Sequence, residues 1–436
     1  MDLVSIALFK KMKRVILLNV IVLLIYPATF AQKITGNWKG NINVNGIELP
    51  IIFHFSKNSN GDIDGKWDSP KQNAIGLPYS SVEESGDSVH IGIKNINGNY
   101  EGKFISNDSI AGTWTQSGNQ LPLNFSRSNG DAETKSIFPA HPNEKEIEIT
   151  SAVGSKLYGT LLSKNNQQPM AIIIAGSGPT DRNGNSPLVE KTNEYEMLAD
   201  SLDSRNIASF RYDKRGVSRS IPSDFDPSKI VFDDYVKDAE KIFDYLHDTL
   251  GFENIYIIGH SEGSLIAMLA SEKKKVKGCI SVAGAGRPID QVLEEQMIRQ
   301  PLPDSVKQQI PVIFNQLKKG KEVNDFPEQL SPLFRKSIQP YLISWLKYAP
   351  QKEIKKLECP VLILQGNCDI QAKETDANNL HEANKKSKLD IIPNMSHTLK
   401  NAGNDCVNEK ETYTNGSMPL DQVLVNDIVS FINTTK

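Results

Sequence analysis

The sequence predicts an α/β protein: a mainly parallel sheet covered on both faces by helices, with a smaller all-β domain in front of it. Three observations predict this arrangement. Within residues 145–436, short β-branched apolar runs alternate with amphipathic helical segments. Residues 32–128 instead show strand-like alternation with no good helix. The chain has 436 residues, of which 39% are hydrophobic, and is long enough for about two domains.

A signal peptide is predicted over residues 1–31. Basic residues precede an apolar run at 15–25, and residues 28–31 provide a small-residue cleavage site. Translation from Met12 would give a signal of more ordinary length. A membrane anchor is the alternative, but the apolar run is short for a spanning helix and ends at Pro27. We therefore expect an exported protein, periplasmic or secreted, with no membrane segment after cleavage.

Residues 32–128 predict an antiparallel meander or small barrel, because alternating segments are separated by Asn, Gly and Asp turn signals. Gly-x-Trp recurs three times, and this motif near a first strand is similar to lipocalin-type barrels, which hold apolar ligands. Tryptophans that simply fill a core explain the pattern as well, and we favour that interpretation. The tryptophans are Trp38, Trp67 and Trp114. Residues 129–144, rich in Ser, Asn, Asp and Glu, are predicted to be a linker.

The second domain is predicted to start with a strand pair around Gly154. Helices alternate with most of the strands that follow, so right-handed crossovers should build a mainly parallel sheet. These strands are predicted at residues 171–176, 207–213, 255–259, 278–284, 361–366 and 389–393. From about 286 to 358 the alternation stops, and helical periods with several prolines predict a cap inserted above the sheet. An excursion away from the site is the alternative.

The segment around Ser261 is the most informative motif. An apolar strand leads into Gly259-His260-Ser261-Glu262-Gly263, and an apolar helix follows at once. Such a strand–turn–helix corner lifts the serine hydroxyl above the end of the sheet. The flanking glycines are expected because the corner leaves no room for side chains. Ser261 is therefore the predicted nucleophile.

A serine hydroxyl needs an imidazole to accept its proton and a carboxylate to orient that imidazole. Asp369 and His397 each follow a predicted late strand, where folds of this kind build their sites. Asp376 and Asp390 are runners-up for the acid, but they fall within a helix and a strand. His260 should face away from the serine. The remaining histidines lie in helical patterns, the linker or the β domain, so His397 is the predicted base.

The oxyanion hole needs two backbone N–H groups aimed at the developing charge. Glu262, directly after the nucleophile and at a helix N-terminus, should supply one. The loop after the first parallel strand should supply the other, from Ser177 or, failing that, Gly178. A dinucleotide-binding glycine motif is disfavoured here because Asp181 stands where its third glycine would be.

A second loop, residues 211–216, concentrates charge after a strand. We expect Asp213–Arg215 or Asp181–Arg182 ion pairs that hold the site loops, rather than contacts to substrate. Four cysteines are too few for a disulfide scaffold. If the acid and base loops converge, however, a Cys368–Cys406 disulfide becomes possible in an oxidising compartment.

The Gly-His-Ser-Glu-Gly motif, the GSGPTDRNG and RYDKRG loops and the later Asp and His together resemble the secreted bacterial α/β-hydrolase esterases of the EstD type, over residues 145–436. The resemblance implies an α/β-hydrolase fold, carboxylesterase activity with Ser261, Asp369 and His397 as the triad, and no metal or organic cofactor. Peptidase or acyl-thioesterase activity of the same fold, or a non-catalytic binding module, are the alternatives. With a formal charge of −3, the chain offers no basic excess for a nucleic-acid partner, so the expected partner is a small-molecule ester. The oligomeric state is left open.

Overall fold

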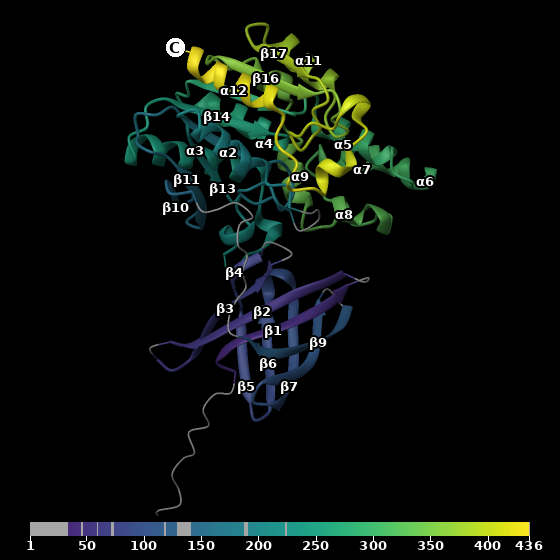
Figure 1. The fold of residues 1–436 in the computed structure, drawn as a ribbon. Coiled ribbons are helices and arrows are strands. Elements are labelled where there is room, and N and C mark those ends of the chain that lie inside the picture. Colours follow the sequence, from purple (N-terminus) through teal and green to yellow (C-terminus); the bar gives the residue numbers. More distant parts are fainter. Residues whose placement is uncertain are drawn as a thin grey trace, which may run out of the picture.

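The computed structural model describes residues 34–44, 47–58, 60–70, 74–116, 119–128, 141–186, 191–222 and 225–435. Two domains follow each other along the chain, a purple-to-blue β domain and a teal-to-yellow α/β domain (Figure 1). The signal peptide predicted at 1–31 and residues 129–140 of the predicted linker lie outside the described residues. Within the described residues, no helix combines the length and the apolar character needed to cross a membrane.

The β domain is one antiparallel sheet of nine strands in the order β4-β3-β2-β1-β9-β8-β7-β6-β5. Strands that follow each other in the chain pair as hairpins, except β4 and β5, which form the two edges of the sheet. β1 also pairs with β9, which brings the first and last strands together. The strands are β1 (Gly36–Val44), β2 (Ile47–Lys57), β3 (Ile63–Ser69), β4 (Ala74–Pro78), β5 (Ser81–Ser85), β6 (Ser88–Ile93), β7 (Gly98–Ser106), β8 (Ser109–Gln116) and β9 (Asn119–Ser128). The result is an antiparallel half-barrel, as the alternating pattern predicts.

The three repeated tryptophans are buried in the core of this domain, which confirms the interpretation that we favoured. They pack with an aromatic cluster in which the rings of Phe53 and Tyr100 each meet the ring of Phe125 edge-on. Trp67 and Trp114 also reach the wall of a cavity at one end of the domain.

The α/β domain contains an eight-stranded sheet in the order β10-β11-β13-β12-β14-β15-β16-β17. The first three strands of this order pair antiparallel and the others parallel. The central strands are buried on both faces, which explains why they read as continuous apolar runs. The strands are β10 (Glu144–Thr150), β11 (Lys156–Leu162), β12 (Met170–Ile174), β13 (Ala208–Tyr212), β14 (Ile255–His260), β15 (Gly278–Val282), β16 (Val361–Gly366) and β17 (Lys388–Ile392).

Helices cover both faces of this sheet through two separate apolar cores. One core includes α2 and α12, and the other includes α3, α4 and α11. These helices are α2 (Glu194–Asp203), α3 (Phe232–Asp244), α4 (Glu262–Lys273), α11 (Glu374–Ala383) and α12 (Gln422–Thr434). A single π-helical turn at Tyr245–Thr249 continues α3. The helical pattern in the sequence therefore runs beyond the end of α3.

The segment between β15 and β16 is helical and forms a cap. Trp345 of this segment stacks on Phe232 of α3 with ring centroids 5.3 Å apart, so the cap shares a core with the sheet-covering helices. Cap residues line the same cavity as Ser261, and the alternative of an excursion away from the site is therefore wrong. The cap helices are α5 (Ile289–Ile298), α6 (Asp304–Lys307), α7 (Gln309–Leu317), α8 (Ser331–Phe334), α9 (Gln339–Trp345) and α10 (Pro350–Ile354).

Candidate active site

Ser261 lies at a strained corner between β14 and α4. Its backbone has φ 55° and ψ −118°, a conformation that costs a non-glycine residue about 1–3 kcal/mol. A Cβ atom at Gly259 would lie 2.1 Å from the carbonyl oxygen of Gly263. A Cβ atom at Gly263 would lie 2.4 Å from the carbonyl oxygen of Ile174. Gly259 therefore lets α4 turn back against the end of β14, and Gly263 lets α4 lie against β12.

His397 and Asp369 form a buried hydrogen-bonded pair, with Nδ1 of the imidazole 2.8 Å from Oδ2 of the carboxylate. Oδ1 of Asp369 accepts the backbone N–H groups of Gln371 and Ala372 at 2.7 and 2.9 Å. The amide of Gln365 donates to Oδ2 at 3.1 Å. Because a carboxylate can only accept, Nδ1 carries the proton and Nε2 is left as the basic nitrogen.

The pair also sets the protonation of both groups. Burial disfavours the charged imidazole, but the charge and hydrogen bond of Asp369 outweigh this and raise the pKa of His397. Burial likewise opposes ionisation of Asp369, yet His397 and the two backbone donors lower the pKa of this carboxyl. Asp369 is therefore ionised at neutral pH, as the orienting group of a triad must be.

Ser261 and His397 line one cavity of about 410 Å³. The walls bring in Ser177, Gly178 and Glu262, the residues predicted to form the oxyanion hole. The cap closes the cavity with apolar and aromatic side chains, among them Ile289, Val292, Leu293, Tyr341, Leu342 and Trp345. Four predicted site residues thus surround one space, and Asp369 lies behind His397. A reacting carbonyl in this cavity would have a serine hydroxyl, an oriented imidazole and backbone donors at hand.

Comparison with known proteins supports the α/β fold described above. Residues 187–402 match the family model described as serine aminopeptidase, S33. The fold is that of the α/β-hydrolases. Among curated proteins, the chain is 23% identical over 251 residues to "Esterase EstD" of Thermotoga maritima, a match covering 55% of each chain. The chain therefore spans about half the length of this curated relative.

Solved structures of esterases are also similar to the chain. Est1E from Butyrivibrio proteoclasticus, solved with ferulic acid bound, is 18% identical, with a TM-score of 0.46 over 66% of this chain and 98% of that one. The Pyrococcus furiosus esterase Pf2001 is 15% identical, with a TM-score of 0.46 over 69% of this chain and 95% of that one.

His260, next to Ser261 in this α/β-hydrolase fold, faces away from the cavity and joins three loops around it. Its Nε2 lies 2.9 Å from the carbonyl oxygen of His397 and its Nδ1 lies 2.7 Å from the hydroxyl of Tyr195. A carbonyl only accepts, so Nε2 carries the proton and the hydroxyl of Tyr195 donates to Nδ1. The same hydroxyl accepts the N–H of Gly176 at 3.0 Å. Burial and the nearby His397 lower the pKa of His260 to about 3, which keeps it neutral.

Lys214 and Glu262 form a buried ion pair under the oxyanion loops, 3.1 Å apart, with side chains 2% exposed. Nζ of Lys214 also donates to the carbonyl oxygen of Gly176, and the hydroxyl of Tyr341 in the cap donates to Glu262 at 2.6 Å. Sequence reasoning did not find this network. The position of Lys214 in the charged loop after β13 was the available signal.

Neither ion pair expected for the charged loops is present. Asp213 instead binds Arg182 at 2.6 Å, and Arg215 binds Asp238 of α3 at 2.6 Å. Oδ1 of Asp181 already accepts the N–H groups of Asn183 and Asn185, and these hydrogen bonds stabilise the turn of its own loop. Arg182 therefore pairs across to the neighbouring loop, and the prediction of local pairs was wrong. The two loops are still held together by charge, through different partners.

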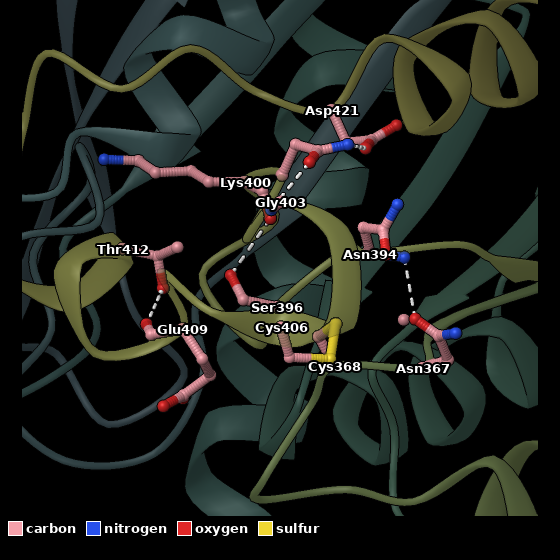
Figure 2. The surroundings of a disulfide bond; sticks show 12 residues. Asn367, Cys368, Asn394, Ser396, Lys400, Gly403, Cys406, Glu409, Thr412 and Asp421 are labelled. Atoms are coloured by element: carbon pink, nitrogen blue, oxygen red, sulfur yellow. Dashed lines mark hydrogen bonds between the residues drawn. A yellow bond between two sulfur atoms is a disulfide. The ribbon is translucent and has the colours of Figure 1, made fainter.

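A disulfide joins Cys368, next to the predicted acid Asp369, to Cys406, which follows the predicted base His397 in the chain (Figure 2). The two loops also meet through backbone groups, because the N–H of Cys368 donates to the carbonyl of Met395 at 3.1 Å. The side chain of Asn367 accepts the N–H of Asn394 at 2.7 Å (Figure 2). The acid and base loops are thus linked covalently and by hydrogen bonds.

Among the residues that the structure describes, no group of three or more His, Cys, Asp or Glu side chains is placed to hold a metal ion.

Proposed function

We propose that this protein is a serine carboxylesterase that cleaves small-molecule acyl esters through an acyl-enzyme. The observation that carries the proposal is the pairing of His397 with Asp369 on the wall of the cavity that contains the strained Ser261. Ser261 attacks the ester carbonyl while His397 accepts its proton, and Asp369 stabilises the resulting imidazolium. The N–H groups of Glu262 and Ser177 stabilise the oxyanion.

The second half of the reaction reverses these roles. His397 gives its proton to the leaving alkoxide, which departs as the alcohol and leaves the acyl group on Ser261. Water then attacks the acyl-enzyme as His397 takes a proton from it, and the carboxylic acid is released when Ser261 regains its proton. Apart from the attacking water, every group in these steps belongs to the chain or the substrate.

An aminopeptidase is the second candidate, because the matching family model carries that description. Such an enzyme needs a free carboxylate to bind the substrate ammonium group. Among the described residues that line the cavity, Glu262 alone carries a carboxylate, and it is already bound by Lys214 and Tyr341. This favours an ester substrate, and amino-acid p-nitroanilides compared with p-nitrophenyl esters would decide between the two.

We also propose that the protein is exported. The support is the signal-like sequence at residues 1–31 together with the Cys368–Cys406 disulfide, a bond that persists in oxidising compartments. N-terminal sequencing of the mature protein should find Gln32 first. Recovery of a cytosolic protein with an intact N-terminus would contradict export.

The decisive experiment compares two serines of the same cavity. The Ser261→Ala variant should lose p-nitrophenyl butyrate turnover by a factor on the order of 10⁶ while staying folded. Ser337 lines the same cavity, and the Ser337→Ala variant should keep normal activity. A fluorophosphonate probe should label the wild type and Ser337→Ala but not Ser261→Ala. Labelling or turnover that survives in Ser261→Ala would refute the assignment.

A further inference from the structure

A second cavity lies between the two domains, at one end of the half-barrel. It has a volume of about 230 Å³. Its β-domain wall comes from the ends of the β1–β2 and β8–β9 hairpins and from neighbouring strands, and includes Val44, Leu49, Trp67, Leu77, Trp114 and Leu121. Its other wall comes from the α/β domain, where Ile221 packs against the β-domain core.

The β-domain wall of this interdomain cavity offers apolar surface and few free polar groups. The indole N–H of Trp67 donates to the carbonyl of Pro78 at 3.3 Å, and that of Trp114 donates to Gln116 at 3.2 Å. The amide of Gln116 in turn donates to the carbonyl of Ile96 at 3.1 Å. Because these polar groups have partners within the protein, an apolar ligand would leave none of them unpaired. On the opposite wall, the carboxyl of Asp181 accepts two backbone N–H groups of its own loop.

The interdomain cavity adjoins the catalytic cavity. Pro179, Gly216 and Val217 line both, so the two cavities meet at these three residues. Pro179 directly follows Gly178 in the predicted oxyanion loop. Gly216 has φ +78°, and a Cβ atom there would lie 2.4 Å from the ring of Phe225, so this position has no room for a side chain at the boundary.

We propose that the interdomain cavity is the distal part of the substrate site and takes the unbranched apolar chain of a long ester. This rests on the proposed esterase function and adds its substrate class. The reacting carbonyl would lie at Ser261, and the chain would run past Pro179 to the half-barrel. Each methylene buried there should improve kcat/KM about fourfold, so three methylenes give roughly 60-fold.

The test uses the full chain and two matched substitutions in the β domain. Val44 lines the interdomain cavity and is 38% exposed, whereas Ile105 is 69% exposed and lines neither cavity. Val44→Trp should lower kcat/KM for p-nitrophenyl dodecanoate at least tenfold and leave p-nitrophenyl acetate within twofold. Ile105→Trp should change neither. Comparing kcat/KM for dodecyl acetate and ethyl acetate in the same variants tells whether the apolar chain bound in the cavity is the acyl or the alcohol part of the ester.

The proposal would be overturned if the ratio of kcat/KM for the long-chain ester to kcat/KM for the short-chain ester were the same in the wild type and Val44→Trp, for both the acyl and the alcohol substrate pairs. That result would leave the esterase function intact. If the wild type cleaves no ester, the esterase function fails, and binding then tests the cavity separately. Calorimetric titration of dodecanoate into Ser261→Ala should show saturable binding that Val44→Trp weakens at least tenfold and Ile105→Trp does not. Equal affinity in all three proteins would overturn the proposal on this arm.

Discussion

The ion pair between Lys214 and Glu262 should hold the two halves of the oxyanion hole together. Glu262 is the residue whose N–H is proposed to stabilise the oxyanion, and Gly176, whose carbonyl also binds Lys214, immediately precedes Ser177. The perturbation is Glu262→Gln, which keeps the shape of the side chain and the backbone N–H but removes the charge. Lys214 is then left buried without its counter-charge.

The size of the effect follows from burial and distance. At 3.1 Å and an effective dielectric constant of 20, the attraction is about 5 kcal/mol. Breaking a buried pair by removing one partner costs about 3–5 kcal/mol. Because large domains lose about 2 °C per kcal/mol, the melting temperature of the α/β domain should fall by roughly 8 °C. Loosening of the oxyanion loop should lower kcat for p-nitrophenyl butyrate about tenfold, less than the loss of an oxyanion donor.

Calorimetry on Glu262→Gln, Lys214→Met and the double variant provides the assay. The double variant should cost about 3 kcal/mol less than the sum of the singles, since it leaves neither charge unpaired. Lys274 and Asp244 form a half-buried ion pair remote from the cavity, so Asp244→Asn serves as the control and should cost about 1 kcal/mol or less. The coupling between Lys214 and Glu262 would be refuted if each single variant lost less than about 1 kcal/mol of unfolding free energy, if these losses added up in the double variant, and if kcat were unchanged.

Three further predictions concern the other parts of the site. Activity should fall with decreasing pH through a pKa above 6.5, because His397 must be neutral to accept a proton. Asp369→Asn should move this acidic limb of the pH–activity profile to lower pH and lower kcat by a factor on the order of 10⁴, and an unmoved kcat/KM profile would contradict the pairing of Asp369 with His397. Reducing the Cys368–Cys406 disulfide, which closes a separation of 38 residues, should destabilise the protein by about 4 kcal/mol and lower its melting temperature by roughly 8 °C; four reactive thiols in denatured, unreduced protein would show that the bond is absent. Gly263→Ala should cost about 1–3 kcal/mol in chemical unfolding, since its Cβ would meet β12, and a wild-type unfolding midpoint would contradict the need for that close approach.

Much of the fold could be predicted because local patterns report burial directly. Strands such as β14 and β16 are buried on both faces and read as uninterrupted apolar runs, and the strands of the half-barrel alternate because one face is solvated. The sharp turn at Ser261 could be recognised in the sequence because only glycines fit on either side of it. The cap was detectable as a loss of alternation, and its position over the cavity could be expected from where it interrupts the sheet.

Contacts between distant loops could not be predicted in the same way. Arg182 and Asp213 lie 31 residues apart, and Arg215 and Asp238 lie 23 apart, so nothing in the local sequence selects these partners over nearer ones. The role of Tyr195 depends on a helix whose apolar face predicts only burial. A tyrosine hydroxyl that fixes a histidine tautomer leaves no periodic signal.

The cap insertion has a consequence for how the proposed enzyme matures. Ser261, the proposed nucleophile, is synthesised before the cap, whereas Asp369 and His397 emerge after it, on the loops that follow β16 and β17. A nascent chain can therefore complete the half-barrel, with three of its four tryptophans, long before a charge relay partner for Ser261 exists. During synthesis, catalytic competence should accordingly appear after the half-barrel tryptophans are buried, and it should mark the docking of the last two strands.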